Sequence, residues 1–86
     1  MSYTVEILKR AEKFLRSVND ARLYRRLRET IDSLGGDPHP PGSKKLVGAL
    51  DLYRVRVGDH RVIYQIDDGK LTILVIEIGH RREIYR

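Results

Sequence analysis

The sequence contains no cysteine and no tryptophan, and it has only one methionine and one phenylalanine. The absence of cysteine excludes disulfides and thiolate metal sites, so a small hydrophobic core must hold the fold without such cross-links. Long apolar runs are also absent, and the opening MSYTVEILKR reaches a charged residue at its sixth position. We therefore expect no signal peptide, no membrane span and a cytoplasmic location.

Acidic residues are outnumbered by basic ones. Seventeen Lys and Arg against 12 Asp and Glu give a net charge of +5, and 12 of the 17 basic residues are arginine. Guanidinium groups bind phosphate in a bidentate manner and stack on bases, whereas lysine acts as a point charge. A polyanion is therefore the leading class of partner, and an ordinary solvated basic surface is the alternative.

The spacing of apolar residues changes along the chain and predicts one α+β domain over residues 1–86. Alternation in YTVEIL predicts a first strand, and two stretches with helical spacing follow it, the second capped by Asn19 or Asp20. The loop GGDPHPPG ends the second helix, and a meander of about three antiparallel strands comes after it. We expect both helices on one sheet face and the first strand beside the last one.

The stretch LYRVRVGDHRVIYQI, residues 52–66, is predicted to be a hairpin with Gly58 and Asp59 as its loop. This register sets Arg56 directly opposite Arg61, with Arg54 on the same face. Like charges at directly opposed positions of two strands are destabilising. The clustering of three cations therefore suggests a binding function.

The two faces of the predicted sheet differ in composition. A second turn at Asp68 and Gly69 gives the helix-covered face a set of mostly apolar residues: Tyr53, Val55, Val57, Val62, Tyr64, Ile66, Leu71, Ile73 and Val75. The opposite face combines the three arginines with aliphatic residues: Leu52, Ile63, Leu74, Ile76 and Ile78. Cations for phosphates beside apolar surface for bases suit an oligonucleotide. The alternative is that the arginine stems cover apolar surface with their charged ends in water.

The residues that could carry chemistry fit cleavage of RNA without a metal. The three histidines have no ligand-like spacing, so we expect no metal and no other cofactor. When a 2'-hydroxyl attacks the adjacent phosphate, the enzyme must supply a proton acceptor, a proton donor and cations around the transition state. The candidate cations are Arg54, Arg56, Arg61, Arg81 and Arg82. Arginine keeps its proton, so the acceptor must be His80, which adjoins the arginines in sequence, His60 or Tyr85.

The hairpin YRVRVGD.RVIY, the tail GHRREIY and the segment DP.P.GSKKL.G together resemble the RelE/ParE superfamily of type II toxin–antitoxin toxins, over nearly the whole chain. The resemblance implies a compact α+β fold like that of small microbial ribonucleases. For the RelE branch it implies metal-independent endoribonuclease activity on mRNA in the ribosomal A site. The implied partners are a RelB-like antitoxin that wraps around the toxin, and the ribosome with bound mRNA.

Site residues follow from the resemblance position by position. It implies that Arg54, Arg56, Arg61, Arg81 and Tyr85 surround the scissile phosphate, with the tyrosine stacking on a base. Some relatives have lysine at the first two positions, where arginine weakens a role as general base, so His80 becomes the local alternative. We also expect RNA contacts from Lys44, Lys45 and Arg82.

Two other functions are compatible with the sequence. A toxin of the ParE branch would share the fold but inhibit gyrase without catalysis, and a non-catalytic RNA-binding module would need only basic helices. The arginine set with its tyrosine favours the ribonuclease, because an inhibitor of a protein does not need convergent phosphate ligands.

Overall fold

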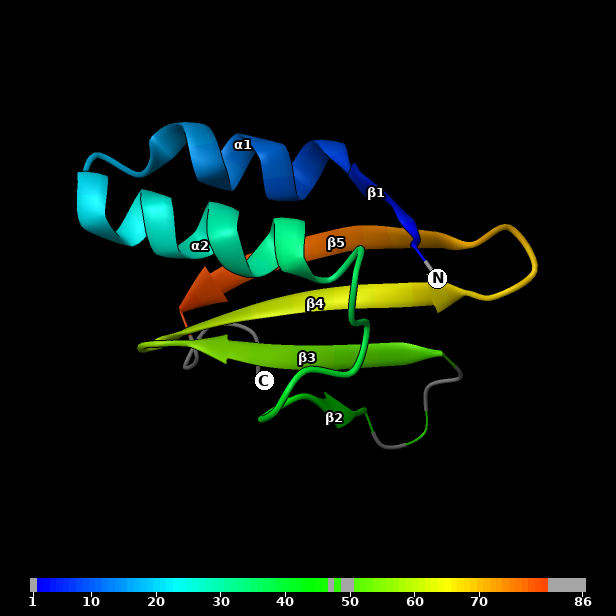
Figure 1. Cartoon of the computed structure of the whole chain (residues 1–86). Coiled ribbons are helices and arrows are strands. Elements are labelled where there is room, and N and C mark those ends of the chain that lie inside the picture. Colours follow the sequence, from blue (N-terminus) through cyan, green and yellow to red (C-terminus); the bar gives the residue numbers. More distant parts are fainter. Residues whose placement is uncertain (1, 47, 49–50, 81–86) are drawn as a thin grey trace.

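The protein is an α+β domain in which two helices pack on one face of a mixed sheet (Figure 1), as the sequence predicted. The computed structural model describes residues 2–46, 48 and 51–80. The elements in chain order are β1 (Thr4–Ile7), α1 (Lys9–Ser17), α2 (Ala21–Ser33), β2 (Lys44–Lys45), β3 (Leu52–Val57), β4 (His60–Asp67) and β5 (Thr72–His80). Within the described residues the strands form one sheet in the order β1-β5-β4-β3-β2. As expected, β1 pairs with β5, in parallel, while the remaining pairs are antiparallel.

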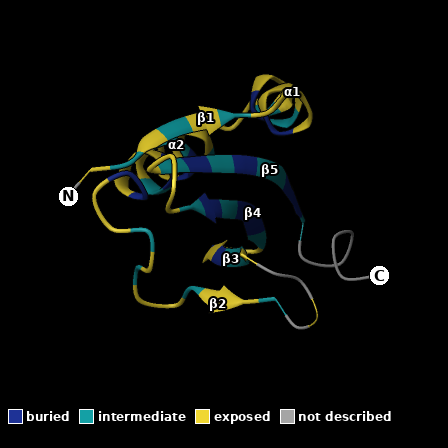
Figure 2. Ribbon diagram, turned by 90° about the vertical axis from the view of Figure 1, so that its right-hand side faces the viewer, coloured by how far each residue is buried: buried dark blue, intermediate teal, exposed yellow. Residues whose placement is uncertain are grey.

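The hydrophobic core lies between the helices and the middle of the sheet (Figure 2). Each helix buries one stripe, which includes Ala11 and Leu15 in α1, and Leu27 and Ile31 in α2. The sheet side of the core is made of residues that alternate along the strands: Val55, Val57, Val62, Tyr64, Ile66, Ile73, Val75 and Ile78. We call this side of the sheet the helix face, and the opposite side, which carries Arg54, Arg56 and Arg61, the arginine face.

Local chemistry sets both ends of α2. The Asp20 side chain accepts hydrogen bonds from the backbone N–H groups of Arg22, at 3.0 Å, and Leu23, at 3.2 Å, and so caps the first turn. After the helix, the backbone N–H of Tyr3 donates a 2.7 Å hydrogen bond to the carbonyl oxygen of Gly35. A Cβ at Gly35 would lie 2.9 Å from the Tyr3 carbonyl oxygen, so glycine allows this close approach of the loop to β1.

The loop after α2 is fixed to the sheet by aromatic side chains. Tyr64 is fully buried, and its hydroxyl donates a 2.7 Å hydrogen bond to the carbonyl oxygen of Pro38. The His39 ring meets the Tyr53 ring edge to face, with centroids 5.1 Å apart, and Tyr53 stacks on Tyr64. This loop therefore covers part of the helix face, beside β3.

The turn between β4 and β5 differs from the prediction. Asp67 pairs with Thr72, so residues 68–71 form a four-residue loop in place of the two-residue turn at Asp68 and Gly69. Leu71 belongs to this loop with φ 49°, and it is 37% exposed. Its predicted place in the core is wrong, because the longer loop removes it from the strand alternation.

A β-bulge produces the second difference. The register between β4 and β5 shifts between Ile63, which pairs with Glu77, and Tyr64, which pairs with Val75. The extra residue, Ile76, reverses the alternation along the rest of β5. Ile78 therefore lies in the core at 3% exposure, and its predicted position on the arginine face is wrong.

Candidate nucleic-acid interface

Two pairs of directly opposed cations lie on the arginine face. Arg56 pairs with Arg61 across the β3–β4 hairpin, as the sequence predicted. Beyond β3, the short strand β2 places Lys44 opposite Arg54. Directly opposed residues project from the same face of a sheet, and so do residues two positions apart on one strand. All four cations therefore lie on one face, and we call Arg56–Arg61 the inner rung and Lys44–Arg54 the outer rung.

The four cations differ in exposure because of their strands' positions in the sheet. Lys44 and Arg56 are exposed and Arg54 is half-buried. Arg61, on the central strand β4, is 3% exposed and is the buried charged residue of the described chain. A guanidinium with little access to water interacts strongly with any anion that reaches it, because solvent screens the attraction less. Arg61 is thus the described cation best placed for a strong, localised charge interaction.

The hairpin loop fixes the register that brings the inner rung together. Val57 pairs with His60, which leaves Gly58 and Asp59 as a two-residue loop. Gly58 has φ 61°, a conformation that glycine adopts without steric cost and that two-residue hairpins require. A shift of one residue would move Arg61 to the helix face. The loop therefore contributes to the site by keeping both arginines on the same face.

Aliphatic side chains adjoin the outer rung. Ile63 pairs with Arg54 and is 9% exposed, and the next row toward the other end of the strands contains Leu52, Gln65 and Leu74. The leucines are only partly exposed. Cations and aliphatic residues therefore share one face of the sheet, as predicted for Leu52, Ile63 and Leu74. The cations lie toward the hairpin loop, and the aliphatic residues lie toward the opposite end of β3.

His80 does not join the arginines. It pairs with His60, and that residue pairs with Val57 on the helix face. The two imidazole rings meet edge to face at 5.5 Å, and the His60 ring contacts the ring of Phe14 in α1 at 5.8 Å. Gly79, not His80, is the residue opposite Arg61. The arginines that adjoin His80 in sequence, Arg81 and Arg82, lie outside the described residues.

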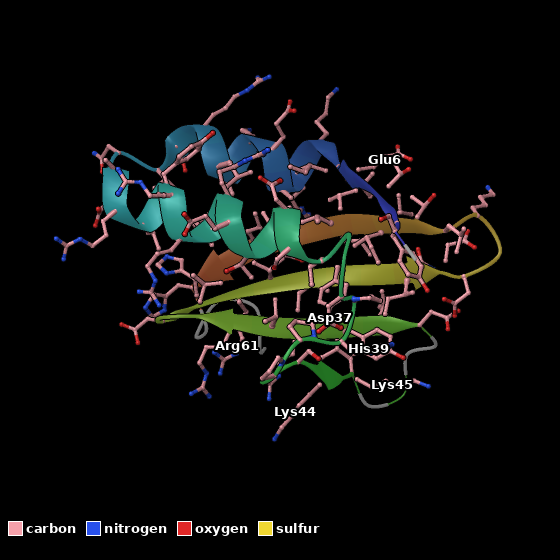
Figure 3. All side chains as sticks on the ribbon, viewed as in Figure 1. Glu6, Asp37, His39, Lys44, Lys45 and Arg61 are labelled. Carbon is pink, nitrogen blue, oxygen red and sulfur yellow. The ribbon has the colours of Figure 1, made fainter. Side chains whose placement is uncertain are left out.

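Lys44 and Lys45 diverge from β2 (Figure 3). Lys45 pairs with Tyr53 and therefore projects on the side of the helix face, whereas Lys44 joins the outer rung. β2 was not predicted as a strand, because two residues are too few to show a periodicity. The Pro-Pro-Gly turn before it marks a place where the chain can reverse. Arg81, Arg82 and Tyr85 lie outside the described residues.

Two tyrosines, Tyr3 and Tyr64, have raised pKa values. Burial raises the pKa of Tyr64, an effect that a hydrogen bond with Ser43 opposes and the charges of Tyr53 and Asp37 reinforce. The hydroxyl of Tyr3 donates a 2.5 Å hydrogen bond to Asp68, and this bond is the main cause of the raised pKa of Tyr3. Both tyrosines fasten loops to the sheet, so their roles are structural.

The described residues show neither a metal site nor a membrane-spanning helix. The described part of the chain holds no group of three or more histidine or acidic residues that could bind a metal ion. Over the same residues, neither helix is long and apolar enough to span a membrane. The arginine face is therefore the feature of the described residues on which a functional assignment can be based.

Comparison with known proteins identifies the family. Residues 5–85 match the family described as the ParE toxin of type II toxin–antitoxin systems, parDE. RelE1 of Methanocaldococcus jannaschii is 33% identical over 89 residues, which cover 100% of this chain and 98% of that protein. The toxin RelG of Mycobacterium tuberculosis is 27% identical over 86 residues, with 100% and 99% coverage.

Solved structures agree with this assignment. The archaeal RelE–RelB complex of Pyrococcus horikoshii matches with a TM-score of 0.81 and 38% identity, over 94% of this chain and 97% of that chain. A chain of the intact RelBE toxin–antitoxin complex of E. coli matches with a TM-score of 0.79 and 25% identity, over 92% and 96% of the two chains. This chain therefore belongs to the RelE/ParE superfamily of type II toxin–antitoxin toxins.

Proposed function

We propose that this toxin is a ribosome-dependent endoribonuclease that cleaves mRNA in the ribosomal A site and thereby stops translation. The observation that supports it most is the inner rung, where Arg56 and the buried Arg61 are held opposite each other. Two guanidinium groups held on one face of the sheet can bind the oxygens of one phosphate together. The toxins named RelE and RelG among the relatives support the RelE branch.

The proposed reaction is a transesterification within the RNA. The 2'-oxygen attacks the adjacent phosphorus, the bond from phosphorus to the 5'-oxygen breaks, and the products end in a cyclic phosphate and a 5'-hydroxyl. One proton leaves the 2'-hydroxyl and another reaches the departing 5'-oxygen. Arg56 and Arg61 would stabilise the negative charge that grows on the phosphorane oxygens, and Arg81 would join them.

The proton carrier must come from outside the inner rung. Both His60 and His80 lie on the helix face, with their rings in contact. We therefore favour Tyr85, which the family resemblance places near the RNA, over His80 for a proton-transfer role. The two assignments differ in the pH profile of cleavage that they predict.

The proposed partner is a RelB-like antitoxin. Structural neighbours from Pyrococcus horikoshii and E. coli are toxins in complex with RelB, and a third comes from the RelBE2 complex of Mycobacterium tuberculosis. We propose that an acidic segment of the antitoxin occupies the arginine face and excludes RNA from it. The ribosome as target also implies that the toxin acts in the cytoplasm.

Two alternatives remain as outcomes of the test. The matching family is described by its ParE toxin, so inhibition of gyrase is the second candidate. A non-catalytic RNA-binding protein is the third. The arginine face favours the ribonuclease over the gyrase inhibitor, because binding to the surface of gyrase would not require two opposed pairs of cations.

A ribosome assay separates the three. Purified toxin is added to ribosomes programmed with a defined mRNA, and cleavage is mapped by primer extension. We expect cuts within the A-site codon, and we expect Arg61→Ala to reduce the single-turnover rate by about 100-fold, the usual effect of losing one transition-state ligand. Arg25→Ala removes the same charge from an exposed position of α2 and serves as the matched control. Intact mRNA together with loss of gyrase supercoiling would establish the second candidate instead.

A further inference from the structure

Backbone hydrogen bonds on both sides of β2 hold Lys44 in its place in the outer rung. The backbone N–H of Ser43 donates a 3.0 Å hydrogen bond to the carbonyl oxygen of Pro40, just before β2. Just after β2, the N–H of Leu46 donates a 2.9 Å hydrogen bond to the carbonyl oxygen of Leu52. The hydrogen bond from Tyr64 to Pro38 fixes the preceding loop. These backbone bonds bring Lys44 opposite Arg54.

The spacing between the two rungs matches the spacing between neighbouring phosphates of a single RNA strand. Arg54 and Arg56 are two residues apart on β3, so the rungs are about 7 Å apart along the strand. One nucleotide of an extended single strand covers a similar distance from phosphate to phosphate. Two consecutive phosphates of one RNA strand can therefore each meet one rung.

The surroundings of the outer rung favour RNA over an acidic peptide. The aliphatic row containing Leu52 and Leu74 lies directly beyond it, and Ile63 is the next residue across from Arg54. Apolar side chains beside cations offer contact area to the faces of bases while the cations bind the backbone. The carboxylates of an acidic peptide would use the cations but have no use for the aliphatic row.

We propose that the outer rung, Lys44 with Arg54, is a second phosphate subsite that binds the phosphate next to the one held at the inner rung. The inference rests on the proposed function for the identity of the ligand as RNA. It assigns to Lys44 a role that its sequence neighbour Lys45 does not share, because Lys45 projects from the opposite face of β2.

The test compares the binding of ligands that carry one phosphate and two phosphates. Uncleavable 2'-O-methyl dinucleotides and trinucleotides without terminal phosphates carry one and two phosphates, and their binding to the free toxin is measured by NMR titration at low salt. We expect the wild type to bind the trinucleotide several-fold more tightly. Lys44→Ala should remove that advantage and leave dinucleotide binding unchanged, and Lys44→Arg should restore it. Lys45→Ala, with the same loss of charge, should retain it.

A longer single-stranded 2'-O-methyl RNA gives an independent readout. The slope of log affinity against log salt should become shallower by about 0.7 in Lys44→Ala, the value for one phosphate contact on a single strand. Equal slopes for Lys44→Ala and Lys45→Ala would overturn the inference. It would also be overturned if Lys44→Ala weakened only the complex with the antitoxin, since the rung would then bind an acidic protein segment.

These measurements are independent of cleavage, so the two proposals can fail separately. A toxin that leaves mRNA intact on the ribosome but binds trinucleotides through Lys44 would refute the nuclease and support the subsite. A toxin that cleaves mRNA but binds both oligonucleotides equally would support the nuclease and refute the subsite.

Discussion

His60 and His80 are directly opposed in β4 and β5, and their rings meet at 5.5 Å on the helix face of the sheet. Arg61 is adjacent to His60 in sequence but projects from the other face. The two titratable rings and the buried guanidinium are therefore separated by the sheet itself.

The first prediction concerns the pH dependence of cleavage. Because the His80 ring lies on the helix face, His80→Ala should leave the shape of the pH–rate profile for single-turnover cleavage unchanged. Tyr85→Phe should flatten its alkaline part, if the tyrosine carries the proton. A pH–rate profile that changes shape in His80→Ala, but not in Tyr85→Phe, would reinstate the histidine as the base.

The second prediction compares activity with stability at Arg61. Arg61→Ala should lower the cleavage rate by about 100-fold, which corresponds to about 2.7 kcal/mol in the barrier. The free energy of unfolding should change by less than about 2 kcal/mol, because relief of repulsion with Arg56 offsets the lost packing. Urea denaturation of the variant and of Arg25→Ala measures the second quantity. An unfolding change as large as the loss of activity would mean that Arg61 is mainly structural.

Tyr64→Phe tests the attachment of the loop after α2. The variant loses the hydrogen bond to Pro38 and should be destabilised by about 0.5–1.5 kcal/mol at neutral pH. The pKa of Tyr64 is raised from 10.0 in the folded chain, so its contribution to stability is complete below pH 10 and declines as the pH rises through the folded value.

The alkaline loss of stability should therefore be smaller in Tyr64→Phe than in the wild type. Tyr3→Phe provides the comparison, because Tyr3 also has a raised pKa and fastens the other loop through Asp68. Thermal unfolding followed by circular dichroism between pH 8 and 11 measures both variants. An identical pH dependence in wild type and Tyr64→Phe would contradict the assignment.

Asp20→Ala should separate helix stability from function. Its carboxylate caps α2 through the N–H groups of Arg22 and Leu23, and removal of such a cap costs about 1 kcal/mol. The cleavage rate per folded molecule should not change, since α2 lies on the face of the sheet opposite the arginines. A rate loss greater than the loss of folded protein would indicate that α2 takes part in substrate binding.

Short-range rules were enough to predict much of this molecule. The two-residue loop at Gly58 and Asp59 predicted the register of Arg56 with Arg61. Asn19 or Asp20 was predicted to cap the second helix, and Asp20 does so. Both features depend on a few neighbouring residues. They were therefore visible in a single sequence.

The errors came from features that depend on distant partners. The β-bulge at Ile76 arises from how β5 fits against β4, and it moved Ile78 into the core and placed His80 with His60. The strand β2 exists only because a loop fixed by Tyr64 brings Lys44 and Lys45 beside β3. Neither feature has a periodicity that the sequence could display.

The parallel pairing of β1 with β5 bears on how the toxin is made. Thr4 pairs with Thr72, so the edge strand β1 and its neighbour β5 are far apart in the sequence. Contacts between distant segments form late, because a large loop must close first. A nascent chain that lacks β5 has neither the partner of β1 nor one neighbour of the strand that carries Arg61. We therefore expect the arginine face to form only after β5 has been synthesised and has paired with β1 and β4.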